Sequence, residues 1–230
     1  MITSLKIAVC GASGRTGSRV AELAAADERF HLLARVDRAQ MVRFEGEVGA
    51  CQAVVDFSAP EATVRYAAAC GRAKVPFISG TTGLSSGQRA QVVAAAKRIP
   101  VFLAPNFSRG VNLLMHLAAE TARQLPGYDA AIIEIHHKTK KDAPSGTALR
   151  LAQAVMEARG TGERVPTVSL RLGGVVGDHE LRFVGSFERL ELIHRAESRD
   201  VFARGALEAA LWSAKKKPGL YGMLDLMALR

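Results

Sequence analysis

The sequence predicts an α/β protein in two parts, a parallel-sheet domain and an α+β domain inserted into it. In the first half of the chain, short apolar runs alternate with alanine-rich segments of helical period. In the second half, three apolar runs follow one another with no helical segment between them. The alternation in the first half favours a parallel sheet with right-handed crossovers. The successive apolar runs of the second half favour neighbouring strands that pair antiparallel.

The first half is expected to hold five strands buried on both faces and three helices that cover them. The predicted strands are Leu5–Cys10, Leu32–Val36, Ala53–Phe57, Pro76–Ser79 and Val101–Ala104. The predicted helices are Arg19–Ala26, Glu61–Ala73 and Gly87–Arg98, each with apolar residues at helical spacing. The connection that holds Gly46–Gly49 is polar and supports no assignment.

The second half opens with an amphipathic helix, Val111–Gln124, which Pro126 and Gly127 end. The elements expected after it are a strand over Ala130–His136, a helix over Ala148–Arg159, strands over Val168–Leu172, His179–Val184 and Phe187–His194, a helix over Ala203–Ser213 and an apolar piece over Tyr221–Met227. We therefore expect a dinucleotide-binding domain over residues 1–107 and 200–230. The inserted α+β domain, with a mixed or antiparallel sheet, would span 108–199.

The composition is that of a globular protein. The 230 residues are 48% apolar and 23% charged, which excludes disordered and fibrous classes. No apolar run approaches the roughly 18 residues of a membrane span. The start, Met1–Lys6, lacks the pattern of a signal peptide, so a cytoplasmic location is expected. Three cysteines without CxxC spacing predict neither a disulfide framework nor a zinc site.

The formal net charge of +9 has two explanations. One is attraction to nucleic acid or to a membrane surface, and the other is a basic pocket for an acidic ligand. The charges are spread along the chain apart from the runs 138–141 and 215–217, and no aromatic residues interleave with these runs. A single-strand binder would need such residues for base stacking. Charge alone leaves both explanations open.

A glycine turn follows the first predicted strand. Gly11, Gly14 and Gly17 stand between that strand and the next helix, in GxxGxxG rather than the usual GxGxxG spacing. Glycine is needed there because a Cβ would keep the pyrophosphate of a dinucleotide from the backbone N–H groups. Asp37 lies 20 residues beyond Gly17 at the end of the next strand, where a carboxylate binds ribose hydroxyls. The pattern predicts a Rossmann-type domain, and Arg38 leaves both NADH and NADPH open as cofactors.

Two further loops follow strands of the same sheet, Gly80–Gly83 and Ala104–Phe107. Ligands of open α/β sheets bind at the carboxyl ends of the strands. We therefore expect these loops to line the nicotinamide end of the site.

The most informative segment runs from Glu134 to Ala148 and reads EIHHKTKKDAPSGTA. His136 and His137 are neighbours at the end of a predicted strand, and their side chains would leave on opposite faces if the strand continues. If the strand continued, Lys138 and Lys140 would share a direction. An imidazole can carry a proton near neutral pH, and an ammonium can hold a carboxylate.

The same segment starts a helix. Ser145 is a predicted N-cap, and Gly146 and Thr147 fall in the first turn, where backbone N–H groups have no acceptor within the helix. This end of the helix favours an anion. Together with the lysines it suits a small dicarboxylate substrate. The remaining histidines show no ligand spacing, so no metal site is predicted.

The segment 134–148 resembles the signature of the 4-hydroxy-tetrahydrodipicolinate (dihydrodipicolinate) reductase family. The resemblance covers nearly the whole chain and includes the stretches 11–17, 56–58, 80–83, 106–112, 171–179 and 202–212. Thr16 stands where a bulkier apolar residue is expected, and the stretch from Ala39 to Cys51 is shorter than in longer members.

The resemblance implies a cytoplasmic, homotetrameric enzyme of lysine and diaminopimelate biosynthesis that uses NADH and/or NADPH and whose inserted sheets pack together. It also implies that the domain 108–199 serves substrate binding and oligomerisation. Its cofactor-binding residues would be Gly11, Ala12, Ser13, Gly14, Arg15, Thr16, Asp37, Arg38, Gly80, Thr81, Thr82, Ala104, Pro105, Asn106 and Phe107. His136 and Lys140 would be the catalytic pair that handles protons. The substrate carboxylates would be held by His137, Gly146 and Thr147.

As a hypothesis, a hydride adds to C4 of a conjugated cyclic imine, His136 supplies a proton to the ring and Lys140 stabilises the charge or relays the proton. One alternative is another two-domain reductase, such as an amino-acid or sugar dehydrogenase with the same nucleotide half. Another is a nucleotide-sensing or nucleic-acid-binding regulator, which predicts a steep salt dependence of DNA affinity and leaves the His-His-Lys arrangement unexplained.

Overall fold

The computed structural model describes residues 4–229, so the expectation for the start of the chain at residues 1–3 lies outside the described part. The chain divides into two compact units, one of residues 1–107 and 200–230 and one of residues 108–199. None of the helices within residues 4–229 combines the length and the apolar content that a bilayer span needs.

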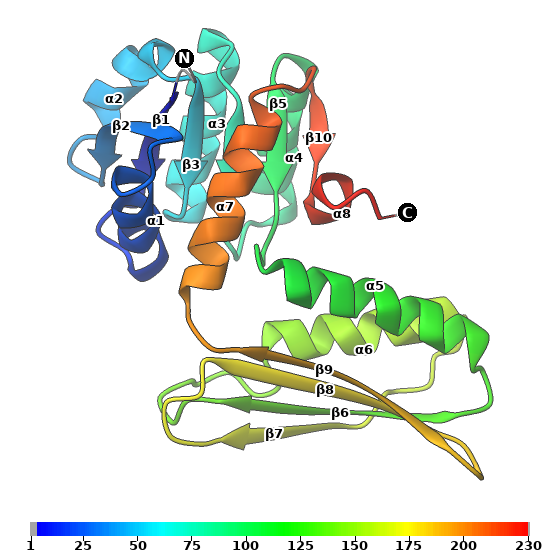
Figure 1. Cartoon of the computed structure of the whole chain (residues 1–230). Coiled ribbons are helices and arrows are strands. Elements are labelled where there is room, and N and C mark those ends of the chain that lie inside the picture. Colours follow the sequence, from blue (N-terminus) through cyan, green and yellow to red (C-terminus); the bar gives the residue numbers. More distant parts are fainter. Residues whose placement is uncertain (1–3, 230) are drawn as a thin grey trace. The chain divides into compact units, whose positions relative to one another are not determined.

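The first unit is built on a parallel sheet of six strands in the order β10-β5-β4-β3-β1-β2 (Figure 1). The strands are β1 (Leu5–Cys10), β2 (Phe30–Val36), β3 (Ala53–Asp56), β4 (Phe77–Ser79), β5 (Pro100–Leu103) and β10 (Gly219–Tyr221). The expected five-stranded sheet thus gains an edge strand, β10, which overlaps the predicted apolar piece Tyr221–Met227 only at Tyr221. The rest of that piece contains α8 (Met223–Leu226).

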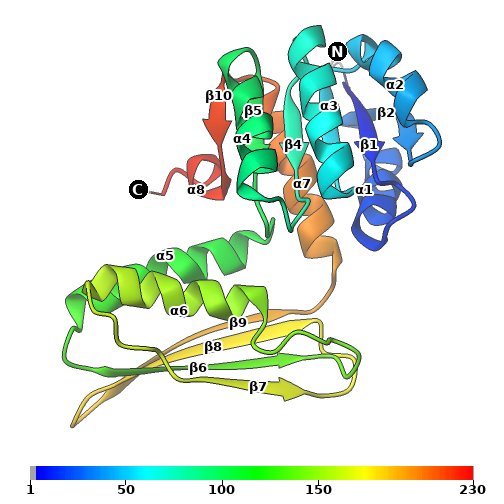
Figure 2. The same ribbon diagram turned by 180° about the vertical axis from the view of Figure 1, so that it is seen from behind.

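Helices cover both faces of this sheet, as Figures 1 and 2 show from opposite sides. One face packs against α1 (Arg15–Ala25) and α7 (Asp200–Ser213). The other packs against α2 (Met41–Glu47), α3 (Pro60–Ala73) and α4 (Ser86–Ala94). Successive side chains of a strand point to opposite faces of the sheet, so each strand contributes to the hydrophobic core on both sides. On β3, Val55 packs in the core under α1 and α7, and Val54 in the core under α2, α3 and α4.

The polar connection around Gly46–Gly49 proves to be ordered. It contains α2 and a 3-10 turn, Val48–Ala50. Phe44 and Val48 are buried, and the Phe44 ring meets that of Tyr66 edge-on at 6.0 Å. Two apolar contacts therefore hold a segment whose overall composition gives no helical signal.

The second unit is a mixed sheet of four strands in the order β7-β6-β8-β9, with two helices on one face (Figure 1). The strands are β6 (Asp129–His136), β7 (Thr167–Arg171), β8 (Gly177–Val184) and β9 (Arg189–Ala196), and the helices are α5 (Arg109–Gln124) and α6 (Gly146–Arg159). Ile132, Leu181 and Phe183 from the sheet pack on Leu114 and Leu151 from the helices.

The sheet is mixed, which is one of the two arrangements that the sequence predicts, but the expected antiparallel pairing of the last three strands fails at β7, which does not pair with β8. β7 pairs with β6 and runs parallel to it, whereas β8 pairs antiparallel with both β6 and β9. The reason is the connection, because β6, α6 and β7 form a strand–helix–strand unit, and such a crossover yields parallel neighbours.

Candidate active site

A cavity of about 630 Å³ opens beside the glycine turn of the first unit. Five predicted cofactor residues are among those that line it, namely Gly11, Ser13, Gly14, Asp37 and Arg38. The lining also includes Met41, Phe57, Ser58, Ala59, Glu61, Ala62, Arg65 and Tyr66. The other predicted cofactor residues are not among those that form its wall. The cavity thus joins the glycine turn to the end of β2, the two places that the sequence assigns to phosphate and ribose.

The glycines of the turn are required by close packing. Gly11 has a φ of 75°, and a Cβ there would lie 2.3 Å from the carbonyl oxygen of Phe57. A Cβ at Gly17 would lie 2.1 Å from the carbonyl oxygen of Gly11. The first turn of α1 is therefore pressed against the strand ends, and its N-cap, Gly14, has no side chain over the N-terminus of the helix.

Asp37 lies directly after β2. Its Oδ1 accepts a hydrogen bond from the N–H of Ala39 at 2.9 Å, which fixes the carboxylate on the loop. Arg38 is exposed beside it. A carboxylate and a guanidinium next to each other can bind ribose hydroxyls and a phosphate respectively.

The loops after β3 and β4 share one buried carboxylate, Asp56. Its Oδ1 accepts from Ser58, and its Oδ2 accepts hydroxyl hydrogen bonds from Thr63, Ser79 and Thr81 at 2.7, 2.8 and 3.0 Å. Burial raises the pKa of the Asp56 carboxyl against the effect of these donors. The carboxylate fixes the start of the loop 80–82, in which Thr82 is exposed.

The loop after β5 divides into buried and accessible residues. Ala104 and Phe107 are buried, and the Phe107 ring packs against Phe57 and Phe102 in the core. Pro105 is exposed and Asn106 is half-buried. Phe107 is thus a core residue of the first unit as well as a predicted cofactor contact.

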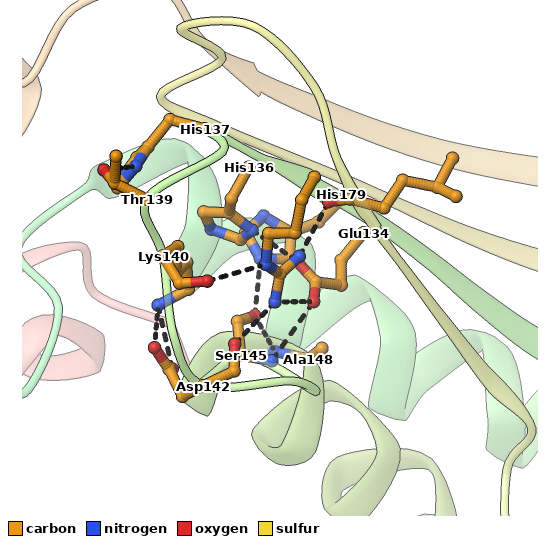
Figure 3. A network of polar contacts seen from close by, with 11 residues as sticks. Glu134, His136, His137, Thr139, Lys140, Asp142, Ser145, Ala148 and His179 are labelled. Atoms are coloured by element: carbon orange, nitrogen blue, oxygen red, sulfur yellow. Dashed lines mark hydrogen bonds and ion pairs between the residues drawn. The ribbon is translucent and has the colours of Figure 1, made fainter.

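In the second unit, the end of β6 carries a buried polar cluster (Figure 3). Glu134 is 0% exposed and His136 is 8% exposed, and both point to the face that the helices cover. His136 Nδ1 bonds a carboxylate oxygen of Glu134. The other oxygen accepts from Arg171 Nη2 at 2.9 Å and from the N–H of Ser145 at 3.3 Å.

A second imidazole completes the cluster. His179 on β8 is 3% exposed and meets the His136 ring edge-on at 5.2 Å. Its Nε2 lies 3.3 Å from Ser145 Oγ, which caps α6 by accepting from the N–H of Ala148. The cluster therefore joins the predicted proton donor to the N-terminus of the helix at Gly146 and Thr147.

The charges in this cluster are set by burial and by ion pairs. Burial disfavours ionisation of Glu134, but hydrogen bonds from Arg171, Ser169 and His136 outweigh it, so the pKa of Glu134 lies below its usual value. Burial lowers the pKa of His136, and Glu134 opposes that shift. Burial and the neighbouring His136 lower the pKa of His179 to about 4. His179 is therefore neutral near pH 7.

Lys140 lies on the loop that follows β6, with a side chain 21% exposed. Its Nζ donates to both oxygens of Asp142 at 2.8 Å, and this hydrogen bond lowers the pKa of Asp142. The positive charge of Lys140 also contributes to the low pKa of His136. Arg171 fixes the loop by donating to the carbonyl oxygens of Lys140 and Asp142.

The expected alternation beyond the strand does not occur. β6 ends at His136, and the N–H of Lys140 turns back to the carbonyl oxygen of His137. A continuing strand, the condition under which Lys138 and Lys140 would share a direction, is therefore not met. His137 bonds Thr139 at 2.8 Å, and Figure 3 shows this pair apart from the buried cluster.

Sequence reasoning missed the roles of Glu134, Arg171 and His179 in this cluster. One signal was available, because Glu134 is two residues before His136 on the same strand and must share its face. Arg171 lies opposite His136 in the register of β6 with β7. That pairing depends on the fold and could not be read from the spacing.

Comparison with known proteins gives one consistent result. A family model described as dihydrodipicolinate reductase, N-terminus, matches residues 5–107, and one described as dihydrodipicolinate reductase, C-terminus, matches residues 110–227. The chain is 44% identical to a 4-hydroxy-tetrahydrodipicolinate reductase of Thiobacillus denitrificans, with 99% of this chain and 100% of that protein covered. A protein of the same name from Xanthomonas campestris pv. campestris is also 44% identical, with 99% and 100% covered.

Solved structures share the fold. A dipicolinate-bound dihydrodipicolinate reductase from Paenisporosarcina sp. TG-14 superposes with a TM-score of 0.82 at 23% identity, over 97% of this chain and 99% of that one. A probable dehydrogenase from Thermotoga maritima reaches a TM-score of 0.63 at 14% identity, over 97% and 93%.

Proposed function

The chain belongs to the dihydrodipicolinate reductase family, and on this premise we propose that it reduces 4-hydroxy-tetrahydrodipicolinate to tetrahydrodipicolinate with NADH or NADPH, a step of lysine and diaminopimelate biosynthesis. The observation that carries the proposal is that the two family models together match residues 5–107 and 110–227 and that His136 and Lys140 lie at the end of β6 and in the loop after it. Reduction consumes one hydride and one proton and releases water and the oxidised nucleotide.

The first unit would bind the dinucleotide. The cavity beside Gly11, Asp37 and Arg38 offers glycine backbone that carries no Cβ, an acceptor for ribose hydroxyls and a cation. These residues fit the phosphate and ribose parts of NADH or NADPH. The loops 80–82 and 104–107 would flank its nicotinamide. The bound cofactor would supply the hydride.

The second unit would hold the substrate and handle the proton. His136 would give a proton to the ring after hydride addition, when negative charge has built up on the substrate. Lys140 would stabilise that charge or pass a proton on. His137 and the N-terminus of α6 at Gly146 and Thr147 would bind the two carboxylates. Positioning and local positive charge would supply most of the rate enhancement.

We also propose that the protein is a cytoplasmic homotetramer. Val168, Leu170 and Ile193 are exposed large apolar side chains on the sheet face opposite the helices, where a second sheet could pack. The three cysteines are free and buried, which suits a reducing compartment. Light scattering should give four times the mass of one chain. A monomer at micromolar concentration would contradict the assembly.

The test of the function is a spectrophotometric turnover assay with enzymatically generated 4-hydroxy-tetrahydrodipicolinate and each nucleotide in turn. The wild-type chain should oxidise the nucleotide only when the substrate is present. His136→Ala and Lys140→Ala should each lower kcat on the order of 10²-fold or more with nucleotide affinity retained. Lys141→Ala, at the exposed neighbouring residue, should leave kcat unchanged.

Two results would contradict this proposal. If the wild-type chain failed to turn over the cyclic substrate but reduced another acid, the substrate assignment would be wrong. If either His136→Ala or Lys140→Ala kept near-wild-type turnover, the role given to that residue would be wrong.

A further inference from the structure

We propose that Glu134 is a positioning residue that holds His136 in its Nδ1–H tautomer and so leaves Nε2 as the atom that exchanges a proton with the substrate. The proposal rests on the function given above and deepens it. Glu134 does not contact the space open to solvent, because it is 0% exposed. It acts through the imidazole.

The carboxylate of Glu134 is held in one place. Arg171 Nη2 and the N–H of Ser145 both donate to Oε1, while His136 Nδ1 bonds Oε2. Arg171 is itself anchored, since it also donates to the carbonyl oxygens of Lys140 and Asp142. A buried carboxylate with a guanidinium and two further donors is ionised. Its two oxygens are therefore acceptors only.

This geometry fixes the proton on His136. A hydrogen bond to an ionised carboxylate requires a donor, so Nδ1 of His136 must carry hydrogen. Nε2 is then the nitrogen with a free lone pair in the neutral ring and the nitrogen that gives up the extra proton of the charged ring. An added Cβ at Gly177 would lie 3.1 Å from Nε2, so the absence of a side chain there leaves room beside this atom.

Glu134 also supports the charged form of the ring. Burial and the charges of Lys140 and Arg171 lower the pKa of His136, whereas the hydrogen bond and charge of Glu134 raise it. Without the carboxylate, a smaller fraction of His136 would be protonated at neutral pH. The reaction needs that proton, so the two effects of Glu134, on tautomer and on protonation, act in the same direction.

The test combines ring-nitrogen NMR of the wild-type chain with kinetics of Glu134→Gln. Long-range ¹H–¹⁵N spectra of the wild-type chain should show His136 protonated at Nδ1 when the ring is neutral. Glu134→Gln should lower kcat on the order of 10²-fold, as removal of a histidine-orienting group does elsewhere. The decline of kcat with rising pH should begin at lower pH, and the KM for the nucleotide should stay unchanged.

Two further variants separate positioning from a general structural effect. Glu134→Asp keeps the charge and should recover part of the lost kcat. Glu120→Gln removes a carboxylate from the solvent-exposed side of α5, where it pairs with Arg123. It should leave the pH profile as it is in the wild type.

A wild-type His136 protonated at Nε2 would overturn the proposal, and this measurement needs no variant to fold. A folded Glu134→Gln variant with the wild-type kcat and pH profile would also overturn it. Failure of the proposed function is distinguishable, because it would show as absent turnover by the wild-type chain while the tautomer of His136 remained measurable.

Discussion

His179 should make the protein sensitive to acid between about pH 7 and about pH 4. The folded state holds this imidazole neutral with a pKa of about 4, because it is buried beside Ser145 and His136. In the unfolded chain its pKa is about 6.5. The unfolded state therefore binds more protons in this window, so the free energy of unfolding falls as the pH falls.

The magnitude follows from the two pKa values. At about pH 4, His179 is half-protonated in the folded state and almost fully protonated in the unfolded state, which costs about 3 kcal/mol of stability relative to about pH 7. Below the folded pKa the loss from this group levels off. The substitution His179→Gln removes the titration and keeps a side chain able to bond Ser145.

Urea denaturation at both pH values measures the effect. The wild-type chain should lose about 3 kcal/mol more between the two pH values than His179→Gln does. His31→Gln, which removes an exposed histidine from β2, should behave like the wild type. Equal acid losses in the wild type and in His179→Gln would refute the reasoning.

Three further predictions concern the cofactor turn and the helix N-termini. Gly11→Ala should abolish detectable NADH binding in a fluorescence titration, whereas Gly160→Ala, also at positive φ but at the end of α6 with no atom within 4 Å of an added Cβ, should bind normally. Arg38→Gln should raise the Kd for NADPH about tenfold and leave the Kd for NADH unchanged. An unchanged Kd for NADPH would show that Arg38 does not bind the 2′-phosphate. Ser145→Ala should lower the free energy of thermal unfolding by about 2 kcal/mol and Ser85→Ala by about 1 kcal/mol. Both hydroxyls cap a helix, but only that of Ser145, which is buried, also bonds a side chain, His179. Equal losses in the two variants would contradict this prediction.

Much of the fold could be predicted because periodicity and glycine placement act locally. β1 was predicted with its observed bounds, and helix α6 ends at Gly160, which adopts a φ of 64° as a C-cap glycine can. The edge strand β10 was not predicted as a strand, since Gly219 and Leu220 show no alternating pattern and only Tyr221 falls in the apolar piece that the sequence offers. Its pairing with β5 is decided by the sheet.

The sheet of the second unit shows where the reasoning failed. The strand, helix and strand that became β6, α6 and β7 were each predicted, and the crossover rule used for the first half would have made the outer pair parallel. β7 was instead grouped with β8 and β9, the two strands that follow it, and its connection to β6 through α6 was overlooked.

The proton-handling cluster was predicted only in part, for a different reason. Alternation along β6 could have placed Glu134 beside His136. Its partner Arg171 lies on another strand, and the register that brings it there is set by packing. His179 likewise reaches the cluster only through the pairing of β8 with β6. Contacts between strands are not encoded in the spacing of a single segment.

Asp56 has a consequence for how the first unit responds to a ligand. Because one carboxyl group is bonded to the loop after β3, to helix α3, to the end of β4 and to Thr81, these four pieces of backbone cannot shift independently. In the proposed binding mode, a nucleotide that moved the loop with Thr81 would pull on the same carboxyl group that holds Ser58 in the wall of the cavity beside the glycine turn. The two ends of an extended dinucleotide would thus be mechanically linked through a single side chain that neither of them touches.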